Sequence, residues 1–211
     1  MGRDARKVCL LLAVCLLAPA FCGCRSIRGQ EPEQGALVTA VGVDRDASGV
    51  RLTLETLIPL EGKGVEVRVL RAVGGSAGEA FAALTAGFPR ALLFGHCAVL
   101  VLGDGLRAEE LGVLRYVEAH PPEMQAVTAP QADALLSLGG LSTPAVGYDL
   151  QAILAGTPGT RCRVYELLSG GMGAVRPEAL PRFVPAAEGS GRLVDLQMPY
   201  DVSQETEKKG D

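Results

Sequence analysis

In residues 50–58, VRLTLETLI, apolar and polar side chains alternate from Val50 to Glu55, which predicts a half-buried β-strand. The apolar set would face a core, and the polar set, Arg51, Thr53 and Glu55, would face the opposite side. ALVTAVGVD (36–44) before this segment also predicts a strand, and VEVRVL (65–70) after it repeats the alternation. Three such segments in succession predict an antiparallel meander with one face exposed to water.

The rest of the chain predicts helices and further buried strands. Ser76 and Glu79 form a capping box at the start of a helix that ends before Pro89. ALLFGHCAVLVLG (91–103) predicts a strand, and its continuous apolar run indicates burial on both faces. A strand is also expected over 124–129, and helices over 107–119, 130–139, 143–156 and 162–169. Strands that come first and helices that dominate later favour an α+β class, with a mainly antiparallel or mixed sheet packed with several helices.

The N-terminus has the organisation of an export signal. Basic residues precede an apolar run, Cys9–Phe21, that is shorter than the ~20 residues of a relaxed bilayer crossing. A short transmembrane anchor or a buried helix is the alternative. Cys24 follows two small residues, Cys22 and Gly23, so we expect it to be the acylated first residue of a mature lipoprotein. Its diacylglyceryl group would hold the protein at a membrane.

The composition limits the partners of the mature chain. Removal of residues 1–23 takes away three basic residues and one acidic residue, which changes the net charge from −4 to −6. An acidic chain without tryptophan is a poor candidate for nucleic-acid binding. We expect a tether over 24–35, an α+β domain over 36–185 and a polar, disordered tail over 186–211.

Three patterns could carry chemistry. DRDASGVRLTLE (44–55) places Asp44, Asp46, Ser48 and Glu55 at calcium-loop positions, but strands flank it where helices are required, so a hairpin turn is the preferred interpretation. GGSAGEAF (74–81) lacks the lysine of a phosphate loop and suits a helix entry.

The histidines and cysteines are the third pattern. His96 and Cys97 would point to opposite faces of a strand, so a buried structural histidine is preferred there; His120 lies in an expected loop. Cys97 and Cys162 could form a disulfide, and two buried free thiols are preferred. We therefore expect no catalytic residue, no metal and no cofactor apart from the lipid.

The ordered motifs resemble the N-terminal domain of the Ger(x)C family, the lipoprotein C subunits of spore nutrient-germinant receptors. The stretches that carry the resemblance are GC (23–24), LVTAVGVD (37–44), LLFGHCAVLVLGDGL (92–106), LRYVEAHPPEM (114–124) and STPAVGYDLQAIL (142–154). Gly95 stands where the family usually has serine, and family members continue through further α/β domains.

The resemblance implies a non-enzymatic protein on the outer face of the inner spore membrane, with two multi-spanning subunits as partners and Cys24 as the lipidated residue. A free-standing lipoprotein that binds a small solute and a Cys97-dependent hydrolase are the alternatives.

Overall fold

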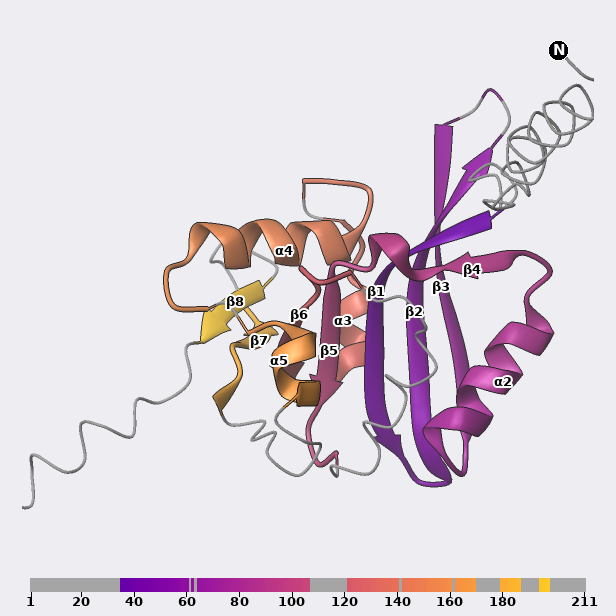
Figure 1. The fold of residues 1–211 in the computed structure, drawn as a ribbon, viewed down its shortest axis with the longest axis horizontal. Helices are drawn as coiled ribbons and strands as arrows, with labels where there is room; N and C mark the ends of the chain where they lie inside the picture. Colours follow the sequence, from indigo (N-terminus) through magenta and orange to yellow (C-terminus); the bar gives the residue numbers. More distant parts are fainter. Residues whose placement is uncertain are drawn as a thin grey trace, which may run out of the picture. The chain divides into compact units, whose positions relative to one another are not determined.

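The three alternating segments form the predicted antiparallel meander. They are β1 (Gly35–Asp46), β2 (Gly49–Leu60) and β3 (Gly64–Gly74) in Figure 1. The computed structural model describes residues 35–60, 62, 64–106, 121–140, 142–160, 162–169, 179–186 and 194–197. Asp46 closes the first turn, because its Oδ1 accepts hydrogen bonds from the backbone N–H of Ser48 at 3.1 Å and from its hydroxyl at 2.9 Å.

Parallel strands extend the meander into an eight-stranded mixed sheet. Its order is β3-β2-β1-β5-β6-β7-β8, with β4 also paired to β1. The added strands are β4 (Ala91–Leu93), β5 (Val99–Gly103), β6 (Gln125–Ala129), β7 (Arg182–Pro185) and β8 (Val194–Gln197). Pairing is parallel from β1 to β7, and β8 returns antiparallel to β7. The α+β prediction is confirmed.

One expected strand is broken in two. The sequence predicts a continuous strand over 91–103, whereas a 3₁₀ turn, η2 (Phe94–His96), separates β4 from β5. The break lies beside an irregularity in β1, where Thr39 is an extra residue between the pairs Val38–Thr56 and Ala40–Glu55. The N–H of Ala98, which lies between η2 and β5, donates to the Thr39 carbonyl at 2.8 Å, so a hydrogen bond joins the two irregular segments.

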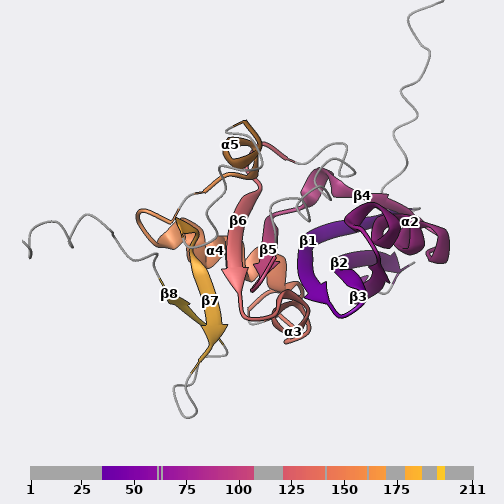
Figure 2. The same cartoon turned by 90° about the horizontal axis from the view of Figure 1, so that it is seen from below.

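Helices cover both faces of the sheet. α2 (Ala77–Gly87) and α5 (Val164–Ser169) pack on one face with Val50, Leu52 and Leu54, the apolar set predicted to face a core. α3 (Ala132–Leu136) and α4 (Val146–Gly156) pack on the other face. In the view of Figure 2, α2 and α3 lie on different sides of the meander.

The second helical layer corrects one prediction. The polar face of β2 was expected to meet water, but Thr53 is fully buried and Glu55 is only 1% exposed, because α3 and α4 return over them. β5 is buried on both faces, as predicted: Leu100 and Leu102 join the α2 side, and Val99 and Val101 join the α3 and α4 side.

The predicted cap of α2 is confirmed. The Ser76 hydroxyl accepts from the Glu79 N–H at 3.3 Å, and the Glu79 carboxylate accepts from the Gly75 N–H at 2.9 Å. GGSAGEAF is thus a capped helix entry. β8 lies inside the stretch expected to be a polar tail, and its Val194 packs with Phe183 in the core. The expected helix over 107–119 lies outside the described residues.

None of the helices in the described ranges is both long enough and apolar enough to cross a bilayer.

We predict that Leu100→Ala lowers the free energy of unfolding by about 2–5 kcal/mol, because it opens a cavity at a fully buried position of the central strand β5. Val65→Ala on edge strand β3 is the control: its side chain is 50% exposed, so its effect should stay within about 0.5 kcal/mol. Urea unfolding checks both values, and equal losses would contradict this description of the core.

Candidate functional site

The carboxylate of Asp44 caps helix α3 from strand β1. Its Oδ1 accepts from the Ala132 N–H and its Oδ2 from the Asp133 N–H, each at 2.7 Å. The N-cap residue of α3, Gln131, makes no side-chain cap bond of its own. Asp44 is 8% exposed, so the first N–H groups of α3 depend on an acceptor that lies about ninety positions earlier in the chain.

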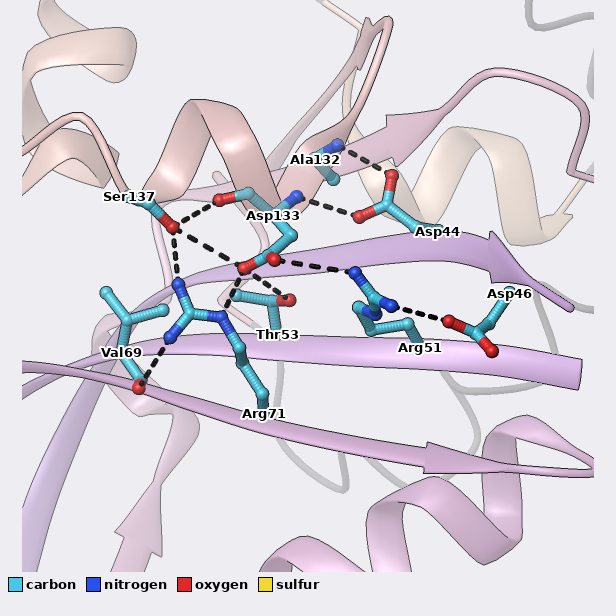
Figure 3. Close-up of polar contacts among 9 residues, drawn as sticks. All are labelled: Asp44, Asp46, Arg51, Thr53, Val69, Arg71, Ala132, Asp133 and Ser137. Atoms are coloured by element: carbon cyan, nitrogen blue, oxygen red, sulfur yellow. Dashed lines mark hydrogen bonds and ion pairs between the residues drawn. The ribbon is translucent and has the colours of Figure 1, made fainter. Parts of the chain in front are cut away.

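Ion pairs surround this cap (Figure 3). Asp133 accepts from Arg71 Nε at 2.6 Å and lies 3.7 Å from Arg51 Nη1, while Arg71 also donates to the Ser137 hydroxyl. We call Asp44, Arg51, Arg71, Asp133 and Ser137 the α3 anchor. The Arg51 and Arg71 side chains are 39% and 44% exposed, so each ion pair contributes at most about 1 kcal/mol. The buried bonds of Asp44 are therefore the stronger part of the anchor.

Glu55 on strand β2 caps helix α4, as Asp44 caps helix α3. Its Oε1 accepts from the Val146 N–H at 2.6 Å, and its Oε2 accepts from the Gly147 N–H at 2.8 Å and the Thr39 hydroxyl at 2.6 Å. We call Thr39, Glu55, Val146 and Gly147 the α4 anchor. Ala145, the N-cap of α4, makes no side-chain cap bond, so Glu55 replaces the usual local cap.

Two glycines make the anchors sterically accessible. A Cβ on Gly147 would lie 2.7 Å from the Thr39 carbonyl oxygen, so a larger residue would push α4 away from β1. A Cβ on Gly103, at the end of β5, would collide with Asp44 Oδ1. The stretches LVTAVGVD and STPAVGYDLQAIL, which carry the resemblance, therefore meet at the α4 anchor.

Opposing effects act on the Glu55 carboxyl. Burial raises its pKa above the usual value near 4.5, and the nearby Asp149 carboxylate adds repulsion in the same direction. Hydrogen bonds from Thr39, Gly147 and Val146 favour the carboxylate and oppose that rise. Because burial is the largest of these effects, the pKa of Glu55 is raised. The ionised carboxylate loses its hydration in the folded protein, and this loss disfavours the charged form.

The calcium-loop pattern is accounted for by these contacts. Asp44 and Glu55 cap different helices, and Asp46 closes the hairpin turn and pairs with Arg51. In the part of the chain that the structure describes, no three His, Cys, Asp or Glu side chains gather as a potential metal site.

The histidine and cysteine positions are partly corrected. His96 is exposed in η2, not buried in a strand as preferred from the sequence, because the 3₁₀ turn projects it out of the sheet. Cys97 is 1% exposed, and burial raises the pKa of its thiol to about 12, which keeps it protonated and unreactive at neutral pH. Cys97 and Cys162 are free thiols, and Cys162 is only half-buried. His120 and Cys24 lie outside the described residues.

Sequence reasoning missed both anchors. A usable signal was present: α3 and α4 follow Gln131 and Ala145, residues that provide no cap bond, while Asp44 and Glu55 are acidic residues on predicted strands. In the anchors, the Thr39 hydroxyl donates to the Glu55 carboxylate at 2.6 Å and the Ser137 hydroxyl donates to the Asp133 carboxylate at 3.5 Å, so both hydroxyls belong to the hydrogen bonds that join the helices to the sheet. The arrangement is that of a rigid scaffold, and its chemistry is suited to holding surfaces in place.

The comparison with protein families identifies one part of the chain. Residues 28–120 match the family described as the spore germination protein N-terminal domain. These residues make up a little under half of the chain, and this part of the chain is similar to that domain. The match supports a role in spore germination, and it includes β1 to β5 with Asp44, Glu55 and Cys97. Neither the curated proteins nor the solved structures yielded a match.

We predict that Asp44→Ala lowers the free energy of unfolding by about 1–3 kcal/mol, because two buried N–H groups of α3 lose their acceptor. Asp104→Ala is the matched control: Asp104 is 54% exposed and pairs with Arg182, so its loss should cost no more than about 1 kcal/mol. Chemical denaturation of both variants measures the difference. A smaller loss for Asp44→Ala than for the control would refute the capping role.

For Glu55 we predict a pH dependence. Because its folded-state pKa is raised, folding binds a proton that the unfolded chain has released, so stability should fall as pH rises from about 4.5 through the folded pKa. Glu55→Gln removes this titration, and its unfolding free energy should lack that part of the slope. Denaturation curves at a series of pH values test this, and parallel profiles for the two proteins would show that Glu55 is not the titrating group.

Proposed function

We propose that this chain belongs to the Ger(x)C family and is a membrane-anchored lipoprotein component of a spore germinant receptor. Cys24 carries the diacylglyceryl lipid, and the folded domain lies on the outer face of the inner spore membrane. There it docks to two multi-spanning receptor subunits and takes part in the nutrient-triggered release of ions and dipicolinate. The observation that carries this proposal is the match of residues 28–120 to the spore germination protein N-terminal domain.

The position of Cys24 supports membrane attachment. The family match begins four residues after Cys24, and ten residues lie between Cys24 and Gly35, the first residue of β1. A chain of that length reaches at most about 40 Å at full extension. A lipid on Cys24 would therefore keep the domain within about one domain diameter of the headgroups.

The net charge of the mature chain and the buried Cys97 thiol support the other parts of the proposal, which are attachment through the lipid and a non-enzymatic role. A mature chain of net charge −6 would be repelled by anionic headgroups, so attachment needs the lipid. Cys97 is buried with a raised pKa, which argues against the Cys97-dependent hydrolase. A docking subunit needs rigid surfaces and no reactive group, which agrees with the anchored helices α3 and α4.

We predict that an alkyne-tagged fatty acid labels the expressed chain and that Cys24→Ala abolishes both the label and sedimentation with membranes. Cys22→Ala is the matched control, since it changes the neighbouring cysteine and leaves the acylated residue in place; it should keep the label. Label that persists in Cys24→Ala, or membrane binding without it, would contradict lipid anchoring at this position.

The receptor role has a separate test. Deletion of the gene in its own spore-former should abolish dipicolinate release in response to the nutrient that its receptor detects, and the wild-type gene should restore it. Affinity capture of the chain from detergent-solubilised spore membranes should recover two multi-spanning proteins. Normal germination of the deletion strain towards every nutrient tested would refute the receptor role, even if Cys24 is lipidated.

A further inference from the structure

Strand β3 forms an edge of the sheet. It stands last in the strand order, and among the described residues β2 is its one neighbouring strand. The strand has 11 residues, contains no proline and keeps an unbroken register with β2 from Gly64 to Gly74. Natural sheets protect an edge with proline, a bulge, a short strand or charges. β3 has only the charges, and these are of both signs.

The backbone of β3 points hydrogen-bonding groups away from the sheet. The Arg68 carbonyl accepts from the Thr56 hydroxyl at 3.0 Å, and Thr56 lies opposite Arg68 on β2, so this carbonyl points towards β2. Carbonyl directions alternate along a strand, so the backbone groups of Val67 and Val69 point the other way. In agreement, the Val69 carbonyl accepts from the Arg71 guanidinium of its own strand at 3.5 Å. The edge therefore presents backbone donors and acceptors at every second residue.

The first half of β3, residues 64–69, is the accessible part of this edge. Helix α2 packs over the second half, where Leu70 and Ala72 join the apolar cluster that contains Ala80 and Leu84. In Figure 1 the start of β3 extends away from α2. Another strand can therefore approach residues 64–69 without displacing the helix.

The two faces of this half carry different side chains. On one face, Arg68 Nε donates to Glu66 Oε1 at 2.7 Å. These side chains are 53% and 37% exposed, so the ion pair is weak and either member can change partners. The other face carries Val65, Val67 and Val69, and Val65 is 50% exposed. The edge thus combines an apolar face with a face on which opposite charges lie two positions apart.

We propose that two copies of this chain pair through β3, antiparallel and centred on Val67. In this register Glu66 lies opposite the partner's Arg68, and the two-fold symmetry repeats the same ion pair on the other side of the centre. On the other face, Val65 lies opposite the partner's Val69. The outward backbone groups of Val65, Val67 and Val69 then meet as hydrogen-bonded pairs, which joins the two sheets into one.

The charges favour this register over its neighbours. Moving the centre by one residue places Glu66 opposite the partner's Glu66, or Arg68 opposite the partner's Arg68, and like charges directly opposite are destabilising. Centring on Val69 leaves Glu66 opposite the partner's Ala72, without a cation. The register centred on Val67 places a cation opposite each Glu66 and brings the valines together.

Charge reversal in the purified full chain, held in detergent micelles, tests the pairing. Glu66→Arg and Arg68→Glu each place like charges opposite one another, so each variant alone should raise the dissociation constant of the dimer about tenfold or more. An equimolar mixture of the two should dimerise like the wild type, because each variant then meets the opposite charge on the other. Both side chains are exposed, so folding should be unaffected. Sedimentation equilibrium in density-matched detergent measures the mass.

Cysteine substitution tests the register. The proposed dimer places Val67 opposite the partner's Val67 at a Cα separation of ~5.5 Å, which a disulfide spans. Val67→Cys should therefore give a linked dimer on mild oxidation, above the background from the chain's own cysteines. Val65→Cys is the matched control on the same face. Its two copies would lie about 14 Å apart along the strands, too far for a disulfide.

Four results would overturn the proposal. A wild-type chain that stays monomeric up to its solubility limit would leave the edge to a strand of a different protein. The proposal also fails if either charge variant alone dimerises like the wild type, if their mixture stays monomeric, or if Val65→Cys cross-links as readily as Val67→Cys. The inference goes beyond the proposed function and is independent of it: none of these results changes lipidation of Cys24 or the germination of the deletion strain.

Discussion

The structure depends on two carboxylates that point from neighbouring strands into the starts of two helices. Asp44 on β1 and Glu55 on β2 each accept two backbone N–H bonds, from α3 and α4 respectively. Both helices begin without a side-chain cap of their own. A helix start buried without acceptors would leave several N–H groups unsatisfied, so the strand carboxylates determine where each helix begins and how it meets the sheet.

The motif TAVGVD on β1 follows from this requirement. Ala40, Gly42 and Asp44 lie on the face that meets α3 and α4, while Val41 and Val43 point to the opposite core. A Cβ on Gly42 would lie 3.0 Å from Leu136 and 3.1 Å from Ala132, so small residues allow α3 to pack closely. Dispersion contacts and the cap of Asp44 then reinforce each other, because the carboxylate reaches the helix only at that separation.

Local patterns predicted the parts of the fold that local interactions determine. The strand predicted from the period-two alternation of 50–55, the Ser76 capping box and the apolar run of β5 were confirmed, since each rests on neighbours in sequence. The covered face of β2 was missed because its cover, α3 and α4, comes about eighty to ninety residues later. The exposure of His96 was missed because the 3₁₀ turn lies beside a bulge at Thr39, which is in another strand. The anchors, which are long-range contacts, could be suspected only from uncapped helices and acids on buried strands.

The proposed role uses this rigidity: a lipid at Cys24 would hold the domain at the membrane, and the anchored helices would keep its surfaces in fixed positions. Amide hydrogen exchange tests the central claim most directly. In Asp44→Ala the account predicts faster exchange at Ala132 and Asp133 with Val146 and Gly147 still protected, and in Glu55→Ala it predicts the reverse. Unchanged protection of all four amides in both variants would contradict the claim that these carboxylates hold the helix starts.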